Sequence, residues 1–230
     1  MSGPSSRETL DALAATDDGT PLADVLAPRE VLSRETVFEG AVWDVATDTV
    51  DLGGGDGPVR RDLVVHPGAV GVLALDADDR VLLLRQYRHP VRHELWEVPA
   101  GLLDVDGEDP AAAAARELRE EADLVAGRLD TLVEWFSTPG GSDEALRVYL
   151  ARDLSVVDEA DRFAREHEEA QMVARWVPLD DARDAVLAGR VHNPTAVVAV
   201  LAAVAARAAG WTTLRPADAP WPAFTERRPA

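Results

Sequence analysis

Cysteine and lysine are both absent from the 230-residue sequence. Without cysteine there can be no disulfide bond and no zinc or iron–sulfur site with cysteine ligands. All 23 basic residues are arginine, so the chain has neither the lysine of a Walker-type phosphate loop nor a lysine that could form a Schiff base. Several large classes of enzyme are thereby excluded.

Long apolar runs are missing as well. No stretch approaches the roughly 20 apolar residues that cross a bilayer, and the first residues lack the basic-then-apolar order of a signal peptide. We therefore expect a cytoplasmic protein with no membrane partner.

Positive charge is scarce, and the net charge of the chain is -19. Nucleic acids and anionic membranes bind to basic faces, so neither is expected as a partner. An acidic protein can still bind an anionic ligand if metal ions and a few arginines reverse the local field. The question of function therefore becomes a question of metal ligands.

The first part of the chain predicts a small β-subdomain. Residues 1–28 have weak periodicity and predict a loosely ordered extension. Strand-like alternation follows in residues 31–38, 41–52 and 59–66, and the glycine-rich run 53–58 predicts the turn between the last two strands. Residues 29–65 are thus expected to form an antiparallel β-meander.

Residues 66–210 are expected to form a second domain that contains both strands and helices. Two apolar runs, 69–76 and 80–87, predict a hairpin, and Asp109-Pro110 predicts the N-cap and first residue of a helix that continues through an alanine-rich run. Further strands are expected in residues 131–136, 145–151 and 171–179, helices in 180–189 and 194–209, and an irregular tail in 211–230. This order predicts an α/β (α+β) fold in which a mixed sheet lies between helices.

The predicted polar helix carries a cluster of carboxylates. Glu117 and Glu121 are four residues apart and share one helical face, with Glu120 to the side. Carboxylate oxygens at this spacing suit a hard divalent cation such as magnesium. The alternative is a solvated surface whose charge Arg116 and Arg119 balance.

The spacing around this cluster resembles the Nudix box. Gly101, Glu108 and the run RELREEADL from Arg116 follow the family pattern G-x5-E-x7-R-E-U-x-E-E-x-G-U, where U is a bulky apolar residue. There are two departures: one extra residue between Gly101 and Glu108, and Asp123 in place of glycine. The extra residue falls in a loop, where length changes are tolerated, and aspartate tolerates the left-handed conformation of a helix end.

Other segments are similar to the ADP-ribose pyrophosphatase branch of the family over roughly residues 30–200. They include LLLRQYRHPV, ELWEVPAGLLD and STPGGSDE, and Pro139 in the last of these resembles the downstream proline of that branch. The resemblance implies hydrolysis of the diphosphate bond of ADP-ribose, with Mg2+ or Mn2+ as cofactor. It implies a Nudix-type α/β/α sandwich and a homodimer.

The resemblance also implies roles for particular residues. The metal would be held by Glu117, Glu121, Glu120 and the carbonyl oxygen of Ala100, and Arg116 would orient the carboxylates. The catalytic base would be Glu168 or Glu169, with Glu168 preferred. The substrate would be contacted by Arg88, Arg61 and Glu144, and by the loop that contains Pro139.

Several alternatives stay open at this point. Arg61 and Arg88 can be strand-surface charges, and Pro139-Gly140-Gly141 can be a plain turn. The substrate can be another nucleotide sugar or a dinucleotide such as NADH. A non-catalytic ADP-ribose sensor is a further alternative, although all the key glutamates are present.

Overall fold

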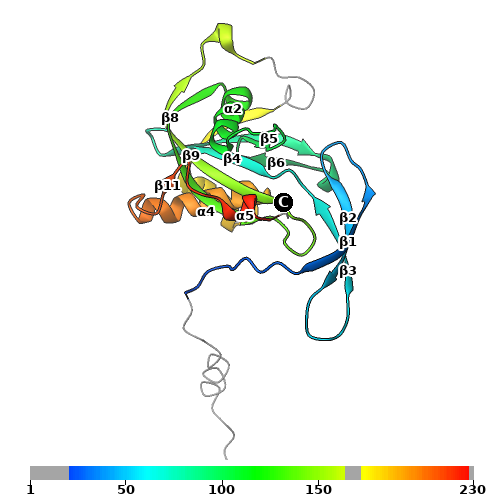
Figure 1. The fold of residues 1–230 in the computed structure, drawn as a ribbon. Coiled ribbons are helices and arrows are strands. Elements are labelled where there is room, and N and C mark those ends of the chain that lie inside the picture. Colours follow the sequence, from blue (N-terminus) through cyan, green and yellow to red (C-terminus); the bar gives the residue numbers. More distant parts are fainter. Residues whose placement is uncertain (1–20, 164–171, 228–230) are drawn as a thin grey trace, which may run out of the picture.

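The computed structural model describes residues 21–163 and 172–227. Its strands form three sheets, with α-helices packed against the larger body and one small sheet standing beside it (Figure 1). The elements are β1 (Glu30–Phe38), β2 (Asp44–Asp51), β3 (Val59–Val65), β4 (Ala69–Ala74), β5 (Arg80–Arg88), η1 (His89–Val91), β6 (His93–Glu97), β7 (Ala100–Leu102), α2 (Pro110–Ala122), β8 (Leu124–Phe136), β9 (Ala145–Val156), η2 (Glu159–Asp161), β10 (Val173–Pro178), α3 (Leu179–Leu187), α4 (Pro194–Ala208), β11 (Arg215–Pro216) and α5 (Pro222–Thr225).

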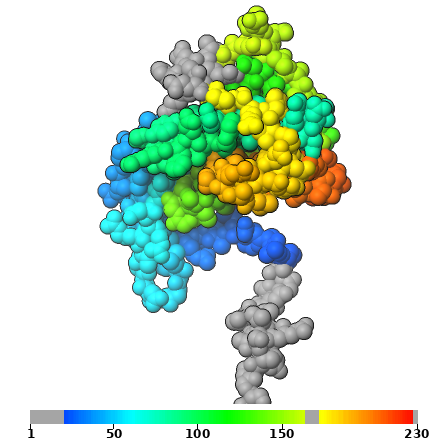
Figure 2. All heavy atoms as spheres, turned by 180° about the vertical axis from the view of Figure 1, so that it is seen from behind, coloured from blue at the N-terminus to red at the C-terminus, as the bar shows by residue number. Residues whose placement is uncertain are grey.

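The N-terminal sheet is the predicted meander. β1, β2 and β3 pair antiparallel in chain order, with Glu30 opposite Asp51 and Asp44 opposite Val65. This sheet projects from the body, as the view from behind also shows (Figure 2). Every residue of β1 is exposed, so the outer strand of the meander is uncovered within the described part of the chain.

The body contains a five-stranded sheet, β11-β8-β9-β4-β7, and a three-stranded sheet, β10-β5-β6. β4 and β9 pair parallel, whereas the other pairs in both sheets are antiparallel. The mixed sheet predicted from the sequence is therefore confirmed.

Alternate residues of the central strands pack against opposite layers of helix. Leu73 on β4 belongs to an apolar cluster with α3 and α4, whereas its neighbour Val72 belongs to a cluster with α2. β5 and β9 divide their side chains in the same way, because successive side chains of a strand point to opposite faces. With α2 on one side and α4 on the other (Figure 1), the predicted α/β/α sandwich is confirmed.

The hairpin predicted from residues 69–87 is wrong. β4 lies in the five-stranded sheet between β9 and β7, and β5 lies in the three-stranded sheet, so only the isolated bridge between Leu75 and Val81 joins the two runs. The turn between them is held by Asp76, whose side chain accepts hydrogen bonds from the backbone of Asp78 and Arg80. All six residues of β4 are buried, which is typical of a strand covered on both faces and paired with distant strands.

The helix α2 begins and ends where the sequence predicts. The Asp109 carboxylate accepts hydrogen bonds from the backbone N–H groups of Ala111 and Ala112 at 2.9 and 3.2 Å, and Pro110 occupies the first helical position, where no N–H donor is needed. Asp123 ends the helix with φ 53°, and its N–H donates to the carbonyls of Arg119 and Leu118. Aspartate is thus accommodated in the left-handed conformation that glycine adopts more easily.

The segment from Trp211 onward, for which the sequence predicts irregular structure, contains two short regular elements. β11 pairs with β8, and α5 places Trp221 in the apolar cluster on the α2 side with 5% of its surface exposed. The guanidinium of Arg147 lies 4.7 Å from the centre of the Trp221 ring.

The domain limits expected from the sequence stay predictions. None of the helices in the described part of the chain is both long and apolar enough to span a membrane.

Candidate active site

The carboxylates of α2 are fastened to the short strand β7. Glu121 accepts a hydrogen bond from the backbone N–H of Ala100 at 2.9 Å. Glu117 lies directly over Gly101, where an added Cβ atom would come within 2.0 Å of its Oε1 atom. The absence of a side chain at Gly101 is therefore what lets the Glu117 carboxylate lie against the strand.

Arg116 connects these carboxylates to the loop before the helix. Its Nε and Nη2 atoms donate to the two carboxylate oxygens of Glu108 at 3.0 Å each. Its Nη1 atom donates to Glu117 at 2.6 Å and to Glu120 at 3.2 Å. The hydrogen bond from Arg116 lowers the pKa of Glu108, and the hydrogen bond to Glu108 is the largest of the effects that raise the pKa of Arg116. Arg116 thus stays charged and donates hydrogen bonds to three neighbouring carboxylates; its role in orienting them for a metal stays a prediction.

The donor set matches a hard divalent cation in chemical type. Glu117, Glu120 and Glu121 supply carboxylate oxygens, which magnesium and manganese prefer. In residues 21–163 and 172–227, no three acidic or histidine side chains are gathered as a ready-made metal site, and Arg116 occupies oxygens of Glu117 and Glu120. The metal-binding role of these glutamates stays a prediction.

Arg88 lies on the same face of the sheets as α2. Leu84 belongs to the cluster that packs on α2, and Arg88 follows it by four residues on β5. Its guanidinium donates to both oxygens of Glu97, with Nε–Oε1 2.9 Å and Nη2–Oε2 2.7 Å. Arg88 is thus paired with a buried carboxylate and is not a simple surface charge.

Glu144 lies at the base of the loop that contains Pro139. It accepts a hydrogen bond from Ser137 Oγ at 2.5 Å, and its second oxygen is 3.6 Å from Nε2 of His66. Pro139 itself is exposed in a tight turn, in which the N–H of Gly141 donates to the carbonyl of Thr138. The turn expected from the sequence is present, and its role in binding stays a prediction.

Arg61 is not brought to this site in the described structure. Arg61 is exposed on β3 of the separate N-terminal sheet and donates to the carbonyl of Arg60. Glu168 and Glu169, the candidates for the base, lie outside the described residues. Their roles stay predictions.

A family model for the NUDIX domain matches residues 65–197, which is more than half of the chain. The chain belongs to the Nudix family. The matched region contains β4–β10, α2 and α3, and thus the whole carboxylate site. Nudix hydrolases generally need a divalent metal ion.

Similar proteins include two curated bacterial relatives. The chain is 44% identical to the ADP-ribose pyrophosphatase of Mycobacterium tuberculosis over 86% of its own length and 96% of that protein. It is 34% identical to the ADP-ribose pyrophosphatase of Bacillus subtilis over 74% of its length and 90% of that protein. A solved structure described as an ADP compounds hydrolase superposes with a TM-score of 0.64 over 82% of this chain and 99% of the other, and at 22% identity it shows the fold alone.

The two departures from the Nudix box fall where they disturb the site little. The extra residue lies in the loop between β7 and α2, which still places Glu108 beside Arg116. Asp123 lies beyond the last turn of α2 and leaves the hydrogen bond between Glu121 and Ala100 in place.

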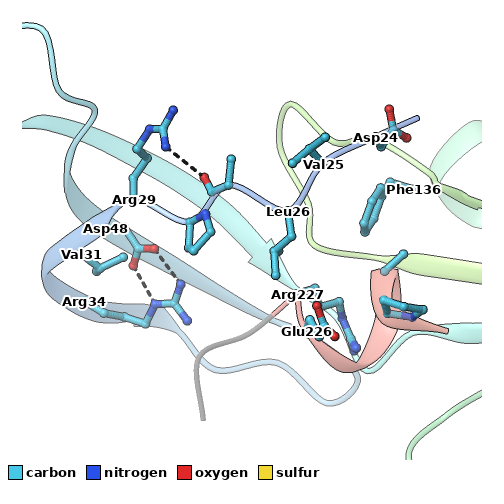
Figure 3. Close-up of a pocket in the computed structure, with 14 residues that line it drawn as sticks. Asp24, Val25, Leu26, Arg29, Val31, Arg34, Asp48, Phe136, Glu226 and Arg227 are labelled. Carbon is cyan, nitrogen blue, oxygen red and sulfur yellow. Dashed lines mark hydrogen bonds and ion pairs between the residues drawn. The ribbon is translucent and has the colours of Figure 1, made fainter. Parts of the chain in front are cut away.

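A cavity of about 1070 Å3 lies apart from these residues, between the N-terminal segment, Phe136 and α5 (Figure 3). Its wall includes Arg34, which donates to both oxygens of Asp48 at 2.6 Å. Arg29 and Arg227 also line the cavity. None of the predicted site residues lines it.

Sequence reasoning missed Glu97. The signal was an acidic residue within the apolar run LWEV, because a glutamate in a buried strand is rare unless it has a partner. The partner, Arg88, is nine residues away in sequence and becomes evident only when β5 and β6 are paired.

Proposed function

We propose that this Nudix hydrolase cleaves the diphosphate bond of ADP-ribose to give AMP and ribose 5-phosphate, with Mg2+ or Mn2+ as cofactor. The observation that carries the proposal is the 44% identity to an ADP-ribose pyrophosphatase over 96% of that protein's length. The carboxylate helix and its arginine supply the groups that such a reaction requires.

The reaction has an electrostatic obstacle that the acidic helix addresses. A diphosphate carries two negative charges that repel an incoming nucleophile. A bound divalent ion supplies positive charge to the phosphoryl oxygens. Glu117, Glu120, Glu121 and the carbonyl oxygen of Ala100 would hold it, and the contacts of Glu121 with Ala100 and of Glu117 with Gly101 fix two of these carboxylates beforehand.

Other residues of the chain bind the substrate and move the proton. Arg88 would bind the diphosphate, and Glu144 the terminal ribose. Arg61 and the Pro139 loop would complete the pocket. Glu168, or otherwise Glu169, would accept a proton from the attacking water as the new oxygen–phosphorus bond forms and the bond to the bridging oxygen breaks. The bridging oxygen leaves as part of the departing phosphate group and carries the negative charge.

A homodimer belongs to the same proposal. All nine residues of β1 are exposed, and its exposed side chains include Val31, Leu32, Val37 and Phe38. Exposed apolar side chains on an outer strand favour burial against a partner. A second copy of the chain is the proposed partner, and a cytoplasmic location stays a prediction.

A substrate panel tests the function. The purified protein is incubated with ADP-ribose, other nucleotide sugars and NADH, with and without Mg2+ or Mn2+, and products are separated by chromatography. We expect metal-dependent formation of AMP and ribose 5-phosphate, with ADP-ribose the preferred substrate. Preference for another panel member contradicts the substrate assignment, and binding of ADP-ribose without cleavage favours a sensor.

A further inference from the structure

The contact between Arg88 and Glu97 spans an unusual distance along the sheet. In the pairing of β5 with β6, Arg88 is opposite His93, and Glu97 is opposite Leu84. The two residues are therefore offset by four positions, roughly 13 Å of strand. Arg88 must extend its side chain back along the sheet to reach Glu97.

This direction brings the guanidinium toward the metal-binding end of the site. Glu97 is followed after two residues by Ala100, whose N–H binds Glu121. Leu84 packs in the cluster on the α2 side, and Glu97, directly opposite it, points to the same side. An Arg88 side chain without this partner would instead be free to extend into solvent, since 44% of it is exposed.

Glu97 is well suited to fix an arginine. It is only 5% exposed, and both of its oxygens accept from the Arg88 guanidinium. Two parallel charge-assisted hydrogen bonds define the plane of the guanidinium as well as its position. The Arg88 side chain is still 44% exposed.

We propose that Glu97 is a positioning residue, which draws Arg88 back along the sheet and presents its guanidinium to the diphosphate of the substrate. This inference rests on the proposed function, because it assigns Arg88 to substrate phosphate. Glu97 acts only through Arg88 and does not contact the reacting atoms.

Glu97→Gln tests this role, because glutamine keeps the size of the side chain but removes the charge and one acceptor. We expect KM for ADP-ribose to rise about tenfold, the effect of one lost charge-assisted hydrogen bond, with a smaller change in kcat. Arg88→Ala should raise KM at least as much. The double variant should resemble Arg88→Ala, because Glu97 has no effect once its partner is gone.

The opposite face of the same strand provides a matched control. Glu94 on β6 pairs with Arg85 at 3.3 Å and is 61% exposed. Glu94→Gln removes a carboxylate from β6 without touching the α2 side, and KM should stay at the wild-type value. Arg88→Lys adds a variant that does not disturb the buried residue; it keeps the charge but cannot form the paired hydrogen bonds, so KM should again rise about tenfold.

Two outcomes overturn the inference. The first is an unchanged KM in both Glu97→Gln and Arg88→Lys. The second is a double variant in which the effects of Glu97→Gln and Arg88→Ala on KM multiply. Calorimetric binding of ADP-ribose in EDTA separates this test from the proposed function. A wild type that binds ADP-ribose in EDTA but does not hydrolyse it when Mg2+ or Mn2+ is supplied contradicts the function, and the Kd of the variants then decides the role of Glu97. If the variants and wild type have equal Kd values, or if wild type does not bind ADP-ribose, the positioning role of Glu97 is overturned.

Discussion

Gly101 offers a test in which activity and stability are expected to separate. In Gly101→Ala the new Cβ atom would lie 2.0 Å from Oε1 of Glu117, whereas ordinary contact begins at 3.4 Å. The carboxylate must therefore move by about 1.4 Å, the difference between these distances. A displacement of about 1 Å in a catalytic group can cost about a hundredfold in rate, or about 2.7 kcal/mol of barrier.

The fold itself should tolerate this substitution. The φ angle of Gly101 is not in the left-handed region, so alanine adopts the same backbone conformation. Replacing glycine at such a position restricts the unfolded chain and contributes about 0.4–1 kcal/mol of stability, which offsets the cost of moving one side chain. We expect an unchanged unfolding temperature together with about a hundredfold loss of kcat/KM for ADP-ribose.

Gly189→Ala is the converse control. Gly189 has φ 66° and open space around it, so alanine there meets no atom but adopts a strained backbone that costs about 1 kcal/mol. This variant should unfold at a lower temperature and keep wild-type turnover at 25 °C. If Gly101→Ala hydrolyses ADP-ribose at the wild-type rate, or loses activity only in proportion to lost stability, the placement of Glu117 against β7 is wrong.

Two further predictions concern stability. Asp109→Ala should lower the free energy of unfolding, measured in urea, by about 1 kcal/mol through loss of the N-cap. Asp109→Asn should unfold like wild type, because asparagine also caps helices. Equal losses in the two variants would contradict the capping role. Burial alone raises the pKa of Asp130, but hydrogen bonds from Arg128 and Arg152 outweigh it and lower this pKa below its ordinary value of 3.8. The stability that Asp130 contributes is complete above that value and is lost as the pH falls through the lowered pKa. Between pH 2 and 7, the unfolding temperature should therefore decline more steeply below about pH 4 in wild type than in Asp130→Asn. Parallel curves for the two proteins would refute this.

Local signals were sufficient to predict helix α2. Asp109 and Pro110 define its start, the alanine run favours helix, and the spacing of Glu117 and Glu121 places both on one face. The contact of Glu121 with Ala100 was not evident, because it depends on how β7 is placed beside the helix. Only the family resemblance implied that the carbonyl oxygen of Ala100 is a metal ligand.

Long-range strand pairing explains what sequence reasoning missed. The runs that form β4 and β5 are both apolar and separated by a short polar turn, a pattern that a hairpin shares with two buried strands of different sheets. The pairing of β4 with β9, more than 70 residues later in the chain, decides between them. The contact between Arg88 and Glu97 was missed for the same reason, since it requires the register of β5 and β6.

The most direct test of the central claim is the rate of AMP formation from ADP-ribose by wild type and Glu121→Gln, measured side by side at saturating Mg2+. Glutamine can keep the hydrogen bond to Ala100 through its carbonyl oxygen but lacks the negative charge that a divalent cation requires. We predict an intact fold by circular dichroism and a loss of turnover of at least about a hundredfold, about 3 kcal/mol of barrier. Turnover by Glu121→Gln close to the wild-type rate would contradict the assignment of the α2 carboxylates as metal ligands.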